Sequence, residues 1–208
     1  MKRSLFLITG CGFIGFNLAK NLNLKNFQLN LIGKKRDIKF KKIIKISKFD
    51  VFDIKKYNNL NFHKSFVILS LLGTKNKNFK AKFLKLIKFF SKKDIKKIVL
   101  LSSVSVYGNS YPKISPLNDY AKKCIYSENI IKKFFKTYLI LRVTNLFGQN
   151  KKYPSTIEKL VMTNLNIKKF SFQNENITRS YLSIDEFSLI IKKVILKNLK
   201  GIYDVSNK

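Results

Sequence analysis

Residues 4–15, SLFLITGCGFIG, decide the fold that we expect for this chain. Their apolar start, Ser4–Thr9, predicts a buried strand, and the apolar positions that follow predict a helix over Phe13–Leu24. Three glycines separate the two elements in the spacing G-x-G-x-x-G. The first glycine permits a tight turn, the second lets a pyrophosphate approach the backbone, and the third lets the helix pack on the strand. The chain therefore opens on a strand–turn–helix unit suited to a dinucleotide.

The phosphates of a dinucleotide would rest on the N–H groups at the start of this helix. We expect the contacts to come from Gly10, Gly12, Phe13, Ile14 and Gly15. The alternative is a glycine-containing turn that holds no ligand. The same stretch, with Met1–Arg3 before it, also resembles a bacterial lipoprotein signal ending at Cys11. Its apolar run is short for a signal peptide and a first strand explains it, so we expect a cytoplasmic chain.

Short apolar runs alternate with longer helical patterns along the rest of the chain, which is typical of a parallel α/β sheet. Further strands are expected at Phe27–Ile32, Lys42–Ile46, Ser65–Leu72, Lys96–Ser102, Tyr138–Val143, Lys168–Phe172, Ser180–Ile184 and Gly201–Val205, and helices at Lys75–Ser91, Asp119–Phe135, Pro154–Leu165 and Asp185–Leu199. We predict an α/β fold, a Rossmann-like doubly wound parallel sheet with a reduced C-terminal substrate lobe. It would form one domain over residues 1–208, with the core at about 1–148 and a substrate-side region at about 149–208.

The composition excludes several other classes of protein. The chain has 208 residues and is 45% hydrophobic, which is too apolar for a disordered chain. With two cysteines and one histidine, His63, we expect neither a disulfide framework nor a metal site, and a histidine-based catalytic triad has only that residue to use. No apolar run is long enough for a membrane span.

The formal net charge of +32 raises the question of a nucleic-acid or other polyanionic partner. Only 4 of the 43 basic residues are arginine, the residue that nucleic-acid sites favour, and the lysines spread from Lys2 to Lys208. Genome-driven drift, in which solvent-exposed positions become lysine, explains this pattern better than a dedicated polyanion-binding site does. We therefore expect no nucleic-acid partner. The positive field would still attract an anionic substrate or cofactor.

The end of the second expected strand bears on the choice of coenzyme. Dinucleotide sites usually have an acidic residue there, which accepts the ribose hydroxyls. Here Gly33–Arg36 contains none. Lys35 and Arg36 suit a 2′-phosphate, which favours NADP over NAD, and the alternative is that both face solvent. After the third strand, an adenine edge could be bound at Asp50 and Val51, where the alternative is a helix cap.

Further motifs make the chain resemble a known family. Ser102–Gly108 is similar to S-S-x-x-V-Y-G, Leu141–Gly148 to L-R-x-x-N-x-Y-G, Arg179–Asp185 to R-D-[FY]-I-H-V-D, and Gly201–Val205 to G-x-Y-x-V. With the glycine turn, these motifs occur in this order in the extended short-chain dehydrogenase/reductase superfamily, in its NAD-dependent epimerase/dehydratase branch. The resemblance covers nearly the whole chain. It implies an oxidoreductase that moves hydride between a nicotinamide and a nucleoside-diphosphate sugar, by epimerisation, dehydration or reduction, for polysaccharide synthesis.

The resemblance also implies catalytic roles. Ser103 would hydrogen-bond the reacting sugar oxygen, and Tyr120 would be the general acid/base. The family has a lysine four residues after this tyrosine, whose charge favours the phenolate. Cys124 occupies that position here, and Lys123, on roughly the same helix face, is the candidate to replace the lysine. The glycine turn is also one residue shorter than the family's usual G-x-x-G-x-x-G.

Substrate contacts follow from the same resemblance, at Ser105, Asn145 and Arg179. Arginine suits a diphosphate through its fixed fork of donors. The alternative for Arg179 is a structural salt bridge with Asp185 or Glu186, and we expect Asp185 to cap the helix that follows.

Three functions remain open from the sequence. The first is the sugar-nucleotide enzyme, paired as a homodimer through the helices at Lys75–Ser91 and Asp119–Phe135 as the resemblance implies. The second is a dinucleotide-binding protein or regulatory subunit without catalysis, which Cys124 favours. The third is a polyanion-binding protein, which only the charge favours.

Overall fold

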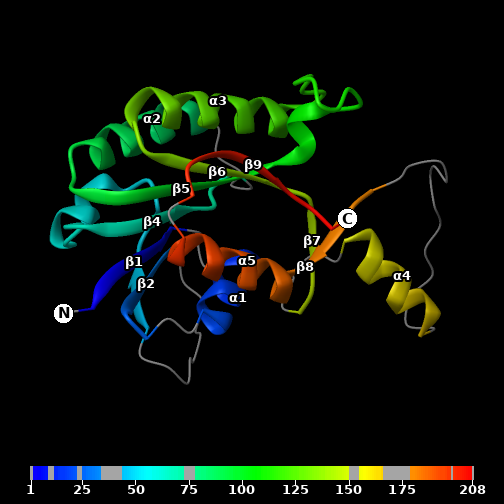
Figure 1. Ribbon diagram of the computed structural model, residues 1–208, viewed down its shortest axis with the longest axis horizontal. Helices are drawn as coiled ribbons and strands as arrows, with labels where there is room; N and C mark the ends of the chain where they lie inside the picture. Colours follow the sequence, from blue (N-terminus) through cyan, green and yellow to red (C-terminus); the bar gives the residue numbers. More distant parts are fainter. Residues whose placement is uncertain are drawn as a thin grey trace.

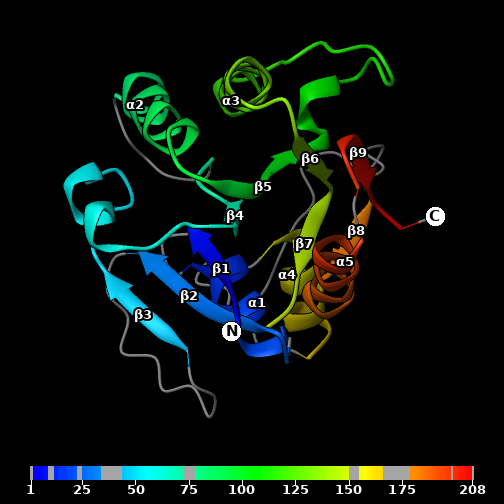
Figure 2. The same ribbon diagram turned by 60° about the vertical axis from the view of Figure 1, so that its left-hand side comes forward.

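The computed structural model of the chain describes residues 2–8, 12–22, 25–33, 44–72, 78–149, 155–165, 179–197 and 199–207. Within them, seven parallel strands form the central sheet in the order β3-β2-β1-β4-β5-β6-β9 (Figure 1; β3 is labelled in Figure 2). They are β1 (Arg3–Ile8), β2 (Phe27–Gly33), β3 (Lys45–Lys48), β4 (Ser65–Leu69), β5 (Ile95–Ser103), β6 (Tyr138–Val143) and β9 (Gly201–Val205). The Rossmann-like doubly wound sheet predicted from the sequence is confirmed.

The order of the strands reverses at β1. This strand pairs with β2 on one side and with β4 on the other, so the chain moves outward to β3 and then returns to the middle of the sheet. In doubly wound sheets, ligands bind beside such a reversal, at the carboxyl ends of the strands. The same edge of the sheet carries the end of β5 and the start of the helix that follows β1.

Two pairs of helices cover the two faces of the sheet (Figure 2). Helices α1 (Phe13–Asn21) and α5 (Ile184–Leu196) pack together on one face, and α2 (Phe79–Ser91) and α3 (Asp119–Phe134) pack together on the other. None of the helices in the described ranges is both long and apolar enough to cross a membrane.

The apolar core lies in two layers, because neighbouring residues of a strand point to opposite faces. Along β1, Leu5 and Leu7 pack on the side of α1 and α5, whereas Phe6 and Ile8 pack on the side of α2. Strand β4 is buried along its whole length, which explains why it appears in the sequence as a continuous apolar run.

A second, smaller sheet is formed by the parallel strands β7 (Asn145–Phe147) and β8 (Tyr181–Ser183). Helix α4 (Thr156–Asn164) follows β7 and has no buried residue. In the described residues, the short 3₁₀ helices η1 (Ile54–Asn59) and η2 (Val104–Tyr107) follow β3 and β5. Because α5 and β9 return to the main sheet, residues 149–208 also contribute to the core, and the division near residue 148 stays a prediction.

Most predicted elements are present, with ends that differ by a few residues. Helix α1 ends at Asn21 and not at Leu24, and β3 begins at Lys45 and not at Lys42. The extended segment predicted at Lys168–Phe172 lies outside the described residues. Strand β7 was not predicted, because three residues are too few to show a periodic pattern.

The start of α5 corrects one prediction, since Ser183 and not Asp185 is its N-cap. The Ser183 hydroxyl accepts a hydrogen bond from the N–H of Glu186 at 3.1 Å, and the Glu186 carboxylate accepts from Ser183 in return. The Asp185 carboxylate instead accepts from the amide of Asn21 at 2.7 Å, which ties α5 to α1.

Gly108 ends η2 at a crowded position of the backbone. Its φ is +54°, and a Cβ there would lie 2.3 Å from the carbonyl oxygen of Ser115. Gly201 also has a positive φ, +99°, but nothing lies within 4 Å of the position that a Cβ would occupy there.

We expect Gly108→Ala to lower the free energy of unfolding by more than about 2 kcal/mol, since a left-handed backbone alone costs about 1–2 kcal/mol for residues other than glycine. Urea unfolding measures this loss. Gly201→Ala is the matched control, and an equal loss in both variants would show that the Ser115 contact costs nothing.

Candidate functional site

The described part of the glycine turn lies at the start of α1. Gly12 is the N-cap of this helix, so no side chain hydrogen-bonds its first N–H groups from that position, and the first turn contains no acidic residue. The positive end of the helix dipole therefore suits an anion. Phe13 and Ile14 are half-buried and Gly15 is buried. Gly10 lies outside the described residues.

The predicted coenzyme contacts beyond the turn are only partly described. Lys35 and Arg36 lie outside the described residues, so their role stays a prediction. Asp50 follows β3, and its Oδ1 accepts a hydrogen bond from the N–H of Phe52 at 3.0 Å. The alternative role of Asp50 as a helix cap is wrong for η1, because Asp53 stands at the N-cap position of that helix.

The backbone of Val51 is held by the buried side chain of Tyr57. Its carbonyl oxygen accepts a hydrogen bond from the hydroxyl of Tyr57 at 2.8 Å. Burial raises the pKa of Tyr57, and the nearby carboxylates Asp50 and Asp53 add to the rise. The loop after β3 is thus held by a neutral hydroxyl donor.

The carboxyl end of β5 brings two of the predicted residues together. Ser103 is 8% exposed and is the N-cap of η2. Its Oγ accepts a hydrogen bond from the N–H of Ser105 at 3.2 Å and donates one to the Ser105 hydroxyl at 3.0 Å. These contacts fix the position of the Ser103 hydroxyl at the edge of the sheet where ligands are expected.

Helix α3 brings Tyr120 to the same place. The helix begins after Asn118, whose side chain accepts the N–H of Ala121 at 2.9 Å, so Tyr120 lies in its first turn. The Tyr120 side chain is 40% exposed and lies close enough to Ser103 for the two side chains to interact. Burial raises the pKa of Tyr120 to about 12, the charge interaction with Cys124 adds to the rise, and the hydrogen bond with Ser103 opposes it.

Cys124 lies one helical turn after Tyr120 and is fully buried. Burial raises the pKa of its thiol to about 11, the carboxylate of Glu128 adds to the rise, and hydrogen bonds with Ser102 and Tyr120 oppose it. Near neutral pH the side chain is therefore an uncharged thiol. It cannot supply the positive charge that the resemblance leads one to expect at this position.

Lys123, the proposed replacement for the missing lysine, contacts a different element. Its Nζ lies 5.8 Å from the centre of the Phe79 ring on α2, a cation–π arrangement. Its role in assisting Tyr120 stays a prediction.

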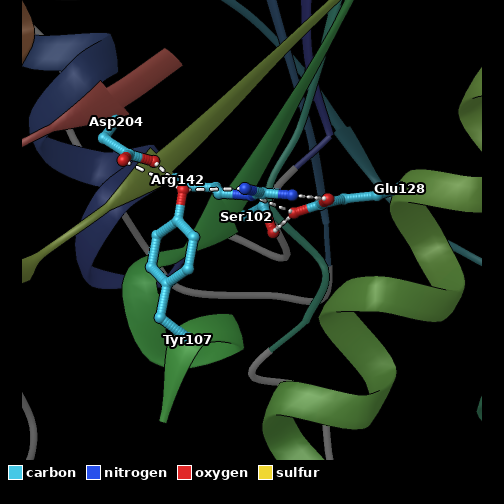
Figure 3. Close-up of polar contacts among 5 residues, drawn as sticks. All are labelled: Ser102, Tyr107, Glu128, Arg142 and Asp204. Carbon is cyan, nitrogen blue, oxygen red and sulfur yellow. Dashed lines mark hydrogen bonds and ion pairs between the residues drawn. The ribbon is translucent and has the colours of Figure 1, made fainter. Parts of the chain in front are cut away.

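A buried polar network joins α3 to the sheet (Figure 3). Ser102 and Asp204 are the register partners of Arg142 on the neighbouring strands, so the three side chains project from the same face of the sheet. Arg142 donates from Nε and Nη2 to the two carboxylate oxygens of Glu128, at 3.0 Å and 2.7 Å. Ser102 donates to the same carboxylate at 2.6 Å. These hydrogen bonds raise the pKa of Arg142, with Glu128 as the main cause.

Tyr107 and Asp204 complete the network on the other side of Arg142 (Figure 3). The Nη1 of Arg142 donates to the Tyr107 hydroxyl at 2.7 Å, and this hydroxyl donates to the Asp204 carboxylate at 2.8 Å and 2.9 Å. The guanidinium also lies 5.1 Å from the centre of the Tyr107 ring. Both charges of the buried pair are thus compensated, which is the condition for keeping an ion pair inside a protein.

Glu128, Tyr107 and Asp204 are members of the network for which no role was predicted from the sequence. One signal was present: Arg142, one of only four arginines, interrupts an otherwise apolar strand. A buried arginine needs partners, but which residues provide them depends on strand register and helix packing.

Strands β7 and β8 bring together the two predicted substrate contacts of the second half. The amide of Asn145 donates to the carbonyl oxygen of Ser180 at 3.3 Å, and Arg179 is the exposed residue just before Ser180. Among the described residues, no ion pair joins Arg179 to Asp185 or Glu186, which bind Asn21 and Ser183. The alternative of a structural salt bridge is therefore wrong for this conformation.

Comparisons with known proteins agree with this fold. A sequence model of the NAD dependent epimerase/dehydratase family matches residues 6–205. No curated protein sequence matches the chain.

Several solved structures share its architecture. A UDP-N-acetylglucosamine 4-epimerase from Methanobrevibacter ruminantium, in complex with UDP-N-acetylmuramic acid, is 21% identical with a TM-score of 0.76, over 99% of this chain and 76% of that one. A UDP-glucuronic acid 4-epimerase mutant from Bacillus cereus, with a fluorinated UDP-glucuronic acid and NAD, is 16% identical with a TM-score of 0.75, over 99% and 78%. A dTDP-glucose 4,6-dehydratase from Bacillus anthracis, with NAD, is 15% identical with a TM-score of 0.75, over 98% and 75%.

The Arg142–Glu128 pair predicts a large effect on stability. Arg142→Met leaves the Glu128 carboxylate buried without its cation, so we expect the free energy of unfolding to fall by about 3–5 kcal/mol. The double variant Arg142→Met/Glu128→Leu removes both charges and should recover part of this loss. Denaturant unfolding of each variant measures the effect.

The control is the exposed pair His63–Asp94, with a 2.7 Å contact between side chains that are 64% and 59% exposed. Asp94→Asn should cost less than about 1 kcal/mol. If Arg142→Met costs no more than this control, the network does not hold the site.

Proposed function

The chain belongs to the NAD dependent epimerase/dehydratase family, and we propose that it is an enzyme that uses a nicotinamide dinucleotide to act on a nucleoside-diphosphate sugar. One observation carries the proposal. Ser103, at the carboxyl end of β5, and Tyr120, in the first turn of α3, lie next to each other on the same edge of the sheet as the start of α1. A hydroxyl pair beside a dinucleotide turn is suited to proton exchange with a substrate oxygen next to a nicotinamide.

The residues at the turn fit a dinucleotide. Gly12 leaves the start of α1 without a side-chain cap, and no carboxylate in the first turn competes with an anion. We propose that Gly10, Gly12, Phe13, Ile14 and Gly15 hold the pyrophosphate and that Asp50 and Val51 lie at the adenine. When bound, the nicotinamide supplies hydride chemistry. NAD in the structures of the dehydratase and the glucuronic acid epimerase supports this class of cofactor, and Lys35 with Arg36 favours NADP within it.

The substrate class is proposed from two observations. Both epimerase structures described above contain UDP-sugar ligands. In this chain, the exposed guanidinium of Arg179 has no ion pair with Asp185 or Glu186, and its paired donors suit a diphosphate. Asn145 and Ser105 are the other proposed contacts. A net charge of +32 would speed the arrival of such an anion.

We propose that Ser103 donates a hydrogen bond to the reacting sugar oxygen and that Tyr120 exchanges a proton with it. Ser105 holds the Ser103 hydroxyl in place on one side. The Tyr120 side chain approaches from α3 on the other. The proposed dimer through α2 and α3 and the assistance by Lys123 belong to the same proposal.

A second candidate is a protein that binds the dinucleotide and does not turn over. The observation that favours it is Cys124, a buried neutral thiol where the family resemblance leads one to expect a lysine. Binding of polyanions has only the overall charge in its favour.

Calorimetric titration with NADH and NADPH tests the cofactor. We expect both to bind, with NADPH the tighter ligand, and Gly12→Val to weaken binding at least tenfold because its side chain occupies the approach of the pyrophosphate. Lys85→Gln is the control, since it removes an exposed charge from α2 and should change affinity less than about twofold. If neither dinucleotide binds, the proposed function is wrong. Tight binding that no nucleotide sugar alters would favour the non-catalytic candidate.

Removal of single hydroxyls tests the catalytic pair. We expect Tyr120→Phe and Ser103→Ala each to lower turnover of a UDP-sugar by about a hundredfold or more, with coenzyme affinity unchanged. Tyr126→Phe is the matched control on the same helix, because its hydroxyl only donates to the carbonyl oxygen of Lys80 at 3.1 Å. Full activity of Tyr120→Phe would exclude Tyr120 as the acid/base.

A further inference from the structure

We propose that this site acts on a keto sugar, because its residues are arranged to give a proton to a carbonyl oxygen and not to take one from a hydroxyl. The inference rests on the proposed function and specifies it. Near neutral pH the side chains around Tyr120 favour reduction of a carbonyl over oxidation of a hydroxyl, and this preference defines the class of substrate.

The first support is the face of α3 that carries Tyr120. Tyr120, Cys124 and Glu128 are spaced by four residues, so they lie in a row on one side of the helix. The middle member is a fully buried, uncharged thiol. The charge of Glu128, the last member, is neutralised by Arg142, whose Nη2 lies 2.7 Å from a carboxylate oxygen of Glu128. This row presents no net positive charge to the Tyr120 hydroxyl.

The second support comes from the elements packed against α3, which are α2, β5, η2 and β6. Their groups facing the helix are Lys80 of α2, over the Tyr126 ring at 5.6 Å, the hydroxyls of Ser102 and Ser103 on β5, Tyr107 of η2, and Arg142 of β6. The guanidinium is paired with Glu128, and Tyr107 with Asp204. On α3 itself, the Lys123 ammonium lies at Phe79, while Asp119 and Lys122 are exposed. Within the described residues, no uncompensated cation contacts the Tyr120 hydroxyl.

The consequence concerns the protonation of Tyr120. With its pKa raised to about 12, only about one molecule in 10⁵ carries tyrosinate at pH 7. A general base must be ionised before it acts, whereas a general acid must be protonated. Nearly every molecule is therefore ready to donate a proton, and very few are ready to accept one.

Reduction of a carbonyl forms one C–H and one O–H bond. A bound, reduced nicotinamide dinucleotide supplies the hydride and is oxidised, while the O–H bond of Tyr120 breaks and its proton passes to the carbonyl oxygen that Ser103 holds. Tyr120 then regains a proton from water. Epimerisation or dehydration through a keto intermediate has to begin with the oxidation of a hydroxyl, which needs the rare tyrosinate form.

The first experiment measures the ionisation of Tyr120 without any turnover. Tyrosinate absorbance is titrated in the wild type and in Tyr120→Phe, and we expect no difference between them up to about pH 10. In Cys124→Lys, compared with Cys124→Lys/Tyr120→Phe, an ionisation should appear below about pH 9, because the new ammonium favours the phenolate. Cys124→Ser is the uncharged control and should resemble the wild type. Circular dichroism over the same pH range shows that each variant stays folded.

The second experiment compares the two directions of reaction. With NADPH and a UDP-4-keto-hexose, the rate of reduction should stay level between about pH 6 and 9. With NADP and the corresponding UDP-hexose, the rate of oxidation should rise about tenfold for each pH unit. Ionisation of Tyr120 below about pH 9 in the wild type, or oxidation that is independent of pH, would overturn the inference and leave the proposed function standing. Failure of any dinucleotide to bind would overturn the proposed function itself.

Discussion

The ion pair between Arg142 and Glu128 is the constraint on which the arrangement of the site depends. It joins the helix that carries Tyr120 to β6, the strand between β5 and the edge strand β9, with both carboxylate oxygens occupied. A charge buried at this depth tolerates very little displacement, because a lost partner leaves the other ion unsolvated. The helix therefore cannot rotate or slide without breaking the pair. This restriction keeps the Tyr120 hydroxyl within reach of Ser103 at the end of the neighbouring strand.

Residue 124 affects the pKa of Tyr120 at this fixed position. The thiol of Cys124 lies near both Tyr120 and Ser102 and adds no charge between them near neutral pH. Burial is the main cause of the raised pKa of Tyr120, and Cys124 adds to the rise, while Glu128 anchors the helix that carries both residues.

The sheet and its order of elements could be predicted from the sequence, because strands buried on both faces must be apolar throughout. Strands β6 and β9 have the predicted bounds. Helix ends were less predictable: α5 begins after Ser183, which forms a capping box with Glu186, while Asp185 binds Asn21, a residue far away in the sequence. The pairing of Ser103 with Tyr120 followed from the family resemblance.

The network around Arg142 could not be predicted, because its members meet only through register. Ser102 and Asp204 are opposite Arg142 on two different strands, 102 residues apart in the chain. A one-residue shift of either strand would turn these side chains to the other face. Local patterns contain no information on such a long-range alignment.

The long separation between partners has a consequence for biosynthesis. The Tyr107 hydroxyl binds Asp204, which lies 97 residues later in the sequence. Asn21 of α1 binds Asp185, which lies 164 residues later. A ribosome releases the first helix long before α5 exists to cover it. During that interval the apolar face of α1 lacks the helix that covers it in the folded chain. The network around Arg142 is complete only after β9 has been made, because Asp204 lies on that strand.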